Sequence, residues 1–350
     1  MEEGKKTLKA GAIHNRRKLA LVISIAALLV AVTILILRPL YAFADCKIDG
    51  NLAFVTHGDI YTTNADKTDL RQLTKLNFTP LAPAWSFDGK QIVFSANQTS
   101  DARNIFVMNA NGTDVHRVTN YAYPYSADDP TWSPDGKKIV FSLYWISAEN
   151  LQKWRSYMAT RTMTPNADKI GTPIPPQTNS EIFSMNADGT SQQNLTRSAN
   201  AEFSPHWSPD GTHIILASTS DAFNRQTSKL YIMNTDGSGL RLLADLYAAA
   251  PKWSPDGRYI VFARRLLIGN SWGSGISIVN ADGTGLRDLV EDATDDFRHP
   301  AWSSDGKNIA FQVWYGDNPE IHIIDFEGKH RCRLIAGDRS FTDFPSWKPQ

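Results

Sequence analysis

The fold of this chain is decided by a segment that recurs along it, Thr131-Trp132-Ser133-Pro134-Asp135-Gly136. Its other copies are Ala84-Trp85-Ser86-Phe87-Asp88-Gly89, His206-Trp207-Ser208-Pro209-Asp210-Gly211, Lys252-Trp253-Ser254-Pro255-Asp256-Gly257 and Ala301-Trp302-Ser303-Ser304-Asp305-Gly306, while Pro345-Ser346-Trp347-Lys348-Pro349 begins a sixth. A proline precedes each tryptophan by two residues. Successive tryptophans lie about 45 to 50 residues apart, with one gap of about 75, and such periods are typical of four-stranded propeller blades.

The same order of elements follows each tryptophan. The Pro-x-Trp segment predicts strand A, and Asp-Gly predicts a tight turn into strand B, such as Ile139-Val140-Phe141. A second apolar run, such as Ile105-Phe106-Val107-Met108, predicts strand C. An Asn-Ala-Asp-Gly-Thr turn then leads to strand D.

The two ends of the sequence complete one blade between them. Residues 48–54 match a turn and strand B, and residues 59–64 match strand C, but no Pro-x-Trp precedes them. The segment at residues 345–347 supplies the missing strand A. The sequence therefore predicts an all-β, six-bladed β-propeller of four-stranded blades over residues 48–350, closed by pairing of the N- and C-terminal strands. The long gap predicts an inserted loop at about residues 143–180.

The repeated residues are expected to be structural. One large aromatic side chain per blade can fill the wedge between neighbouring sheets and bury on the order of 200 Å². The turn aspartates are expected to accept hydrogen bonds from backbone amides, while glycine adopts a positive φ. We assign this structural role to Trp85, Trp132, Trp207, Trp253, Trp302 and Trp347.

These units resemble the TolB-like, WD-repeat-like propeller family, whose repeat has the form Pro-x-Trp-Ser-Pro-Asp-Gly followed by strands and Asn-Ala-Asp-Gly. The resemblance covers roughly residues 46 to 350. It implies the propeller fold, and propellers of this kind are used for protein binding and also accompany enzymes. The sequence lacks the additional N-terminal domain expected of TolB itself, so a direct TolB role is not implied.

The N-terminal residues predict a membrane anchor. Residues 1–18 are basic, and the uncharged apolar run at 19–37 would span roughly 28 Å as a helix, close to the hydrocarbon thickness of a bilayer. We expect a cytoplasmic tail, a single transmembrane helix and a linker at 38–47, with the propeller on the extracytoplasmic side. Alternatively, Ala42-Phe43-Ala44 is typical of a signal-peptide cleavage site, and cutting near Ala44 would give a secreted protein.

Charge and cysteine content narrow the possible functions. The chain has 36 basic and 36 acidic residues, and no repeat carries a dense basic cluster, which disfavours nucleic-acid binding. The two cysteines, Cys46 and Cys332, have no metal-type spacing. They could pair in an oxidising compartment, but we expect them to remain apart, because Cys46 precedes an inner strand and Cys332 falls on an outer one.

The connections between strands differ at the two ends of the blades. The A–B and C–D turns are nearly uniform, whereas the B–C and D–A connections vary in length and composition, and variable loops on a rigid scaffold commonly carry function. Aromatic residues interleaved with charges suit a peptide, glycan or protein ligand. The candidate binding residues are Tyr125, Asp128, Asp129, Trp145, Trp154, Tyr157, Glu202, Trp272, Asp295, Asp296, Arg298, Trp314, Tyr315 and Asp343. A solvated acidic rim is the alternative interpretation of the carboxylates.

An enzyme is the second functional hypothesis, either a polysaccharide lyase or a hydrolase acting in the central channel. Gly269-Asn270-Ser271-Trp272-Gly273 matches a nucleophile elbow, but it falls in a B–C loop of an all-β repeat. His206 and His299 flank inner strands, yet the other histidines fall elsewhere, so we predict no metal or cofactor. A divalent cation among Asp128, Asp129, Asp295 and Asp296 is the exception left open. We expect a non-catalytic, membrane-anchored scaffold for a protein or polymer ligand.

Overall fold

Twenty-four strands make up the part of the chain described by this computed structural model, namely residues 46, 48–98, 102–146, 152, 178–220, 227–269, 271–316, 318–336 and 342–349. The predicted tail and membrane helix at residues 1–37 lie outside these residues. So do most of the linker and most of the inserted loop. Within the described part, no helix has the length and apolar character needed to cross a membrane.

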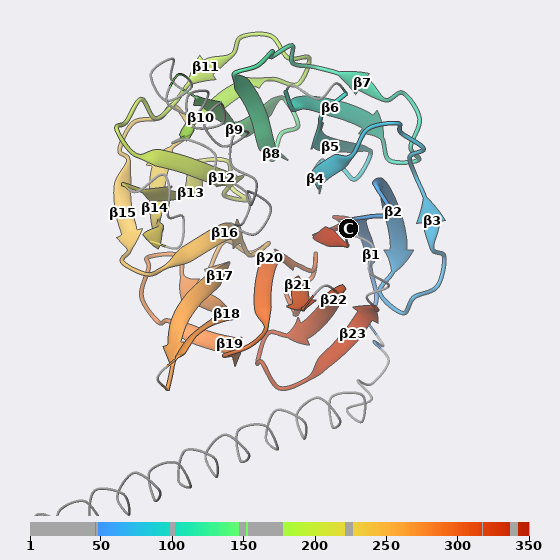
Figure 1. Cartoon of the computed structure of the whole chain (residues 1–350), viewed down its shortest axis with the longest axis vertical. Coiled ribbons are helices and arrows are strands. Elements are labelled where there is room, and N and C mark those ends of the chain that lie inside the picture. The colour runs from blue at the N-terminus through green and yellow to red at the C-terminus, as the bar shows by residue number, and fades with distance from the viewer. Residues whose placement is uncertain are drawn as a thin grey trace, which may run out of the picture. The chain divides into compact units, whose positions relative to one another are not determined.

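The strands form six antiparallel sheets arranged around a central axis (Figure 1). Blade 1 comprises β24 (Asp343–Trp347), β1 (Asn51–Thr56), β2 (Asp59–Asn64) and β3 (Arg71–Gln72). Blade 2 comprises β4 (Pro80–Trp85), β5 (Gln91–Ala96), β6 (Asn104–Asn109) and β7 (His116–Arg117). Blade 3 comprises β8 (Tyr125–Trp132), β9 (Lys138–Ile146), β10 (Thr178–Asn186) and β11 (Gln193–Asn194).

The other three blades follow in chain order. Blade 4 comprises β12 (Ala201–Trp207), β13 (His213–Thr219), β14 (Lys229–Asn234) and β15 (Arg241–Ala244). Blade 5 comprises β16 (Ala248–Trp253), β17 (Tyr259–Ile268), β18 (Ser271–Asn280) and β19 (Arg287–Asp292). Blade 6 comprises β20 (Asp296–Trp302), β21 (Asn308–Tyr315), β22 (Asn318–Asp325) and β23 (Arg331–Ile335). The predicted all-β, six-bladed propeller with four-stranded blades is confirmed.

The A–B turns owe their uniformity to one hydrogen-bond pattern. In blade 3, Ser133 Oγ donates to Asp135 Oδ1 at 2.7 Å, and the same oxygen accepts the Lys137 backbone N–H at 3.1 Å. Ser133 Oγ also accepts the Lys138 backbone N–H at 2.9 Å. These hydrogen bonds lower the pKa of Asp135 and keep it ionised. The Ser-x-Asp-Gly sequence thus sets the turn into strand B.

The six repeated tryptophans are buried, and each lies between two blades. Trp132 packs with Val93 and Val107 of blade 2, although it belongs to blade 3. Trp302 of blade 6 packs with Val261 of blade 5 in the same way. The described core divides into six clusters, and each of them contains one of these tryptophans. Burial of this aromatic therefore joins successive sheets as well as filling its own blade.

The glycines of the C–D turns allow the blades to approach closely. Gly189 has a φ of 86°, and a Cβ atom there would lie 1.9 Å from the carbonyl oxygen of Val118 in the preceding blade. Gly112 meets Leu73 in the same way, at 2.2 Å. A side chain at either position would force neighbouring blades apart, so the repeated Asp-Gly serves packing between blades as well as the turn.

Ring closure differs from the sequence-based expectation at one point. β24 pairs with β1, as Leu52 opposite Trp347 shows, so the C-terminus supplies the inner strand of blade 1. Cys46 is therefore not held in an inner strand, and it reaches blade 6. The prediction of unpaired cysteines is wrong, because Cys46 forms a disulfide with Cys332 on β23, with a Cα–Cα distance of 5.4 Å.

Candidate functional site

A backbone irregularity shapes the inner strand of every blade. Three residues before each repeated tryptophan, the chain adopts a positive φ of 46° to 54° at a residue other than glycine. The positions are Ala82, Asp129, Ser204, Ala250, His299 and Phe344. The pairing register between strands A and B shifts at each of these points, which marks a β-bulge. The six bulge residues line a central cavity, and we call them the bulge ring.

A second ring lies two residues further along each strand. It consists of the residues immediately before the tryptophans, namely Ala84, Thr131, His206, Lys252, Ala301 and Ser346. The two rings line a cavity of about 440 Å³, together with side chains of the A–B turns such as Phe87, which is 38% exposed. The cavity therefore reaches the surface at the end of the propeller that carries the A–B and C–D turns, which we call the turn end.

Ionisable side chains of the cavity come from four successive blades, namely Asp129 of blade 3, His206 of blade 4, Lys252 of blade 5 and His299 of blade 6. Ser204 Oγ donates to Asp129 Oδ2 at 3.0 Å. Burial and the neighbouring charge of Asp128 raise the pKa of Asp129. Burial lowers the pKa of Lys252 to about 8, while the charge of Asp129 acts in the opposite direction. Asp129 and Lys252 thus interact electrostatically, although no ion pair is formed between them in the described part of the chain.

His206 is neutral in this setting. Its Nδ1 accepts the backbone N–H of Trp253 at 3.4 Å, so the ring proton lies on Nε2. Burial, and next the charge of Lys252, lower the pKa of His206 well below its ordinary value. A hydrogen bond with the Trp207 backbone acts in the opposite direction but does not offset burial, so the ring stays neutral.

His299 is held on the opposite side of the bulge ring. Its Nδ1 lies 2.7 Å from Oδ1 of Asp343, which is 2% exposed. The imidazole stacks on Phe344, with ring centroids 4.2 Å apart. Asp343 was expected at the ligand-binding surface. It is instead buried next to the bulge ring, where its carboxylate fixes the orientation of His299.

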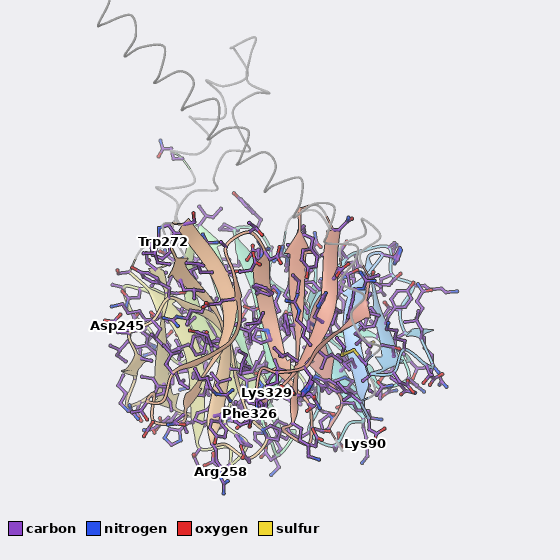
Figure 2. All side chains as sticks on the ribbon, turned by 90° about the horizontal axis from the view of Figure 1, so that it is seen from below. Lys90, Asp245, Arg258, Trp272, Phe326 and Lys329 are labelled. Atoms are coloured by element: carbon purple, nitrogen blue, oxygen red, sulfur yellow. A yellow bond between two sulfur atoms is a disulfide. The ribbon has the colours of Figure 1, made fainter. Side chains whose placement is uncertain are left out.

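The opposite end of the propeller, which we call the variable end, carries the B–C and D–A connections. Figure 2 shows Trp272 at this end, while Lys90 and Arg258 of the A–B turns lie at the other end. Trp272 is 57% exposed, and its ring centroid lies 5.8 Å from that of Tyr247 in the neighbouring D–A connection. These two residues form an aromatic patch on blade 5.

Two further patches lie at the variable end. On blade 3, Tyr125 stands directly opposite Trp145 in the β8–β9 pairing, so both side chains share one face of the sheet. On blade 6, Arg298 pairs with Asp296 at 2.5 Å and stacks over the Trp314 ring, with its guanidinium carbon 5.3 Å from the ring centroid. Five of the predicted residues thus occur in these two patches, and a sixth, Trp272, occurs in the patch on blade 5.

Other predicted residues lie inside the protein. Asp128 forms an ion pair with Arg103 and accepts a hydrogen bond from Ser95. Tyr315 Oη accepts from Arg331 Nη2 at 2.8 Å. Burial lowers the pKa of Arg331, and the charge of Asp295, which is 9% exposed, acts in the opposite direction. These side chains stabilise blade edges, because a charge so close to the core needs a partner.

Glu202 is fully buried on β12, next to the base of the inserted loop. Burial raises its pKa to about 7, although hydrogen bonds from Ser198 and Ser218 favour the charged form. Its Oε2 atom has no hydrogen-bond partner among the described residues. Trp154 and Tyr157, predicted in the same region, lie outside the described residues.

The four aspartates considered for a cation do not converge. Asp128 and Asp129 lie on blade 3, whereas Asp295 and Asp296 lie at the start of blade 6. No group of three or more potential metal ligands occurs among the described residues. Ser271, the serine of the Gly-x-Ser-x-Gly match, begins β18 in a strand-to-strand hairpin, whereas a nucleophile elbow requires a turn into a helix.

Neither Lys252 nor His206 was predicted as a binding residue. Their positions in the repeat identify them, because the residues one and three places before the repeated tryptophan line the same cavity in every blade. The amino acids at these two positions differ between the six copies of the repeat, and such variation within a constant motif indicates a candidate binding position.

Comparisons with known proteins agree with this architecture. A family model described as the TolB beta propeller domain matches residues 147–350, more than half of the chain. The fold is similar to TolB from Acinetobacter baumannii, with a TM-score of 0.64 and 17% identity over 88% of this chain and 68% of that chain. It is also similar to a putative TolB from Agrobacterium tumefaciens, with a TM-score of 0.58 and 18% identity over 86% and 99% of the two chains.

A chain of the nidogen/laminin complex has a similar fold as well. Its TM-score is 0.59 at 13% identity, over 85% of this chain and 98% of that one. A search of the curated proteins found no match. At such identities, the likeness to solved structures shows the fold alone.

Proposed function

Because the chain belongs to the TolB beta propeller domain family, we propose that it is a non-catalytic scaffold that binds a protein or polymer ligand through the variable end of its blades. The propeller supplies a rigid frame, and the B–C and D–A connections supply the contacts. A similar fold occurs in a complex of two proteins, nidogen and laminin, which supports a protein as the ligand.

The distribution of exposed aromatic side chains carries the proposal. Five are exposed among the described residues, and four of them, Tyr123, Tyr125, Tyr247 and Trp272, belong to the variable end. Phe87 is the remaining one. Tyrosine and tryptophan are enriched at protein interfaces, because they combine a large apolar surface with a hydrogen-bonding group. Their concentration at one end favours that end as the docking surface.

We further propose that the propeller faces an extracytoplasmic compartment. The Cys46–Cys332 disulfide supports this placement, because disulfides form and persist in oxidising environments. Residues 19–37 would then anchor the chain as a single transmembrane helix, and a secreted protein cleaved near Ala44 is the alternative.

The test is partner capture with the full chain from detergent-solubilised source membranes. Wild type is compared with a double variant, Tyr125→Ser and Trp272→Ser, which removes an exposed aromatic from each of two patches. We expect the double variant to lose at least tenfold of the partner that wild type enriches, since large aromatics are frequent hot spots of binding.

Leu70→Ser is the matched control, because Leu70 is 59% exposed in a C–D turn of blade 1, at the turn end. It should capture the partner as wild type does. Capture that is unchanged in the double variant, or equally weakened in Leu70→Ser, would contradict a docking surface at the variable end.

A further inference from the structure

The central cavity holds charged and polar groups that the proposed docking surface does not use. The Lys252 ammonium group forms no hydrogen bond or ion pair with any described residue, and the neutral His206 ring lies on the neighbouring inner strand. Both side chains belong to the cavity lining. A charge surrounded by protein on all sides is costly unless a counter-charge accompanies it. The Lys252 ammonium group is therefore available to bind an anionic group that enters the cavity.

Asp129 supplies the opposite charge on the same wall. It is fixed by Ser204 and interacts electrostatically with Lys252, without an ion pair between them. A ligand with only a negative charge would be repelled by Asp129, and one with only a positive charge would be repelled by Lys252. A ligand that carries both charges satisfies both residues.

Part of the remaining wall is apolar. Ala82 and Ala84 of blade 2 and Phe344 of blade 1 line it, together with the repeated tryptophans. A volume of about 440 Å³ falls within the range of small-molecule pockets, roughly 300–1,000 Å³. The cavity therefore suits a small molecule with a polar, doubly charged end and an apolar body.

From these observations we propose that the cavity is a binding site for a small zwitterion of the α-amino acid class. Lys252 binds the carboxylate beside the neutral His206 ring, Asp129 binds the ammonium group, and the side chain packs against the wall formed by Ala82, Ala84 and Phe344. Access is from the turn end, where Phe87 is exposed. The site is separate from the aromatic patches and does not depend on them.

The experiment is calorimetric titration of the full chain in detergent with L-leucine and two analogues that each lack one charge. N-acetyl-L-leucine retains only the carboxylate, and L-leucine methyl ester retains only the ammonium group. We expect L-leucine to bind, and each analogue to bind at least tenfold more weakly. Absence of L-leucine binding at millimolar concentration would overturn the proposal, and so would equal binding of either analogue.

Two variants assign the contacts. Lys252→Met and Asp129→Asn should each weaken L-leucine binding at least tenfold, whereas Lys307→Met, on an exposed A–B turn, should leave it unchanged. Thermal unfolding and partner capture are measured on the same samples, so that misfolding and failure of the docking surface are recognised separately. If a variant does not fold, the analogue series on wild type still decides the proposal. Wild-type affinity in both cavity variants would overturn it.

Discussion

His322 illustrates how a buried network fixes the protonation of a single residue. Its side chain is fully buried on β22. Arg331 Nε donates to Nδ1 at 2.9 Å, and since arginine can only donate, the ring proton lies on Nε2. Nε2 then donates to Glu320 Oε2 at 2.7 Å. Burial lowers the pKa of His322 to about 4, despite the hydrogen bond to Glu320, which acts in the opposite direction.

This pKa predicts a loss of stability in acid. Between pH 6.5 and about 4, the unfolded chain binds a proton at His322 that the native state does not, so the free energy of unfolding falls as pH decreases. The contribution is at most about 3 kcal/mol. We expect His322→Gln, which can accept from Arg331 and donate to Glu320, to flatten this slope. Denaturant unfolding at several pH values measures it.

The comparison must be made against wild type, because Glu202 acts in the opposite direction. Its pKa of about 7 makes the native state bind the extra proton, so its contribution to stability decreases as pH rises from 4.5 to 7. His116→Gln, a change at a histidine on the two-residue outer strand β7, is the control. A slope in His322→Gln as steep as in wild type would show that the buried histidine does not titrate as described.

At the scale of an element, the β-bulge makes the inner strand a ligand-facing surface. The bulge residue adopts a left-handed conformation, which costs an L-residue roughly 1–2 kcal/mol. The same strained conformation occurs in every blade. The shift in register that accompanies it places the residues before the tryptophan at the cavity, while the tryptophan packs between the blades. Of the six bulge residues, Ala82, Ala250 and Phe344 have no polar side chain that would stabilise this conformation locally.

Replacing alanine by glycine should therefore have opposite effects at neighbouring positions of β16. Ala250 has a φ of 51°, and Ala250→Gly should leave stability unchanged or raise it by up to about 1 kcal/mol. Ala249 is paired with Ala263 in ordinary strand geometry, and Ala249→Gly should lower stability by about 0.5–1 kcal/mol. Chemical denaturation compares them. Equal destabilisation by both changes would mean that the bulge is not strained.

Strands and turns could be predicted from sequence, because the same chemistry repeats in each blade. The hydrogen bonds of Ser133 and Asp135 form within the same turn, so the local sequence alone is sufficient to predict the turn. The cavity could not be predicted in this way. Lys252 and His206 take their environment from other blades, and pairing of Cys46 depends on where the chain crosses to blade 6. Contacts between distant segments have no local signature.

On the scale of the whole molecule, two links close the ring. β24 pairs with β1 by hydrogen bonds, and the disulfide joins the segment before β1 to β23 of the neighbouring blade. Figure 1 shows β24 beside β1, with β23 in the adjacent blade. Without the disulfide, the N-terminal segment would be held near blade 6 by packing alone. The covalent link therefore stabilises the one place where the chain is discontinuous around the ring.

Removing this link should weaken the closure more than the rest of the propeller. The bond spans 286 residues, and loops of this length correspond to a stabilisation of about 2–5 kcal/mol, mostly by restriction of the unfolded chain. A Cys46→Ser, Cys332→Ser variant should show a lower unfolding midpoint and no response to reductant, whereas reductant should lower the wild-type midpoint towards that of the variant. Amide hydrogen exchange locates the effect: β1 and β24 should exchange faster in the variant, while β13 and β14 of blade 4 should change little, because they lie far from the closure. Uniformly faster exchange in all blades would show that the disulfide acts only on the unfolded chain and not on the closure. Two reactive thiols in unreduced, unfolded wild type would show that the bond does not form.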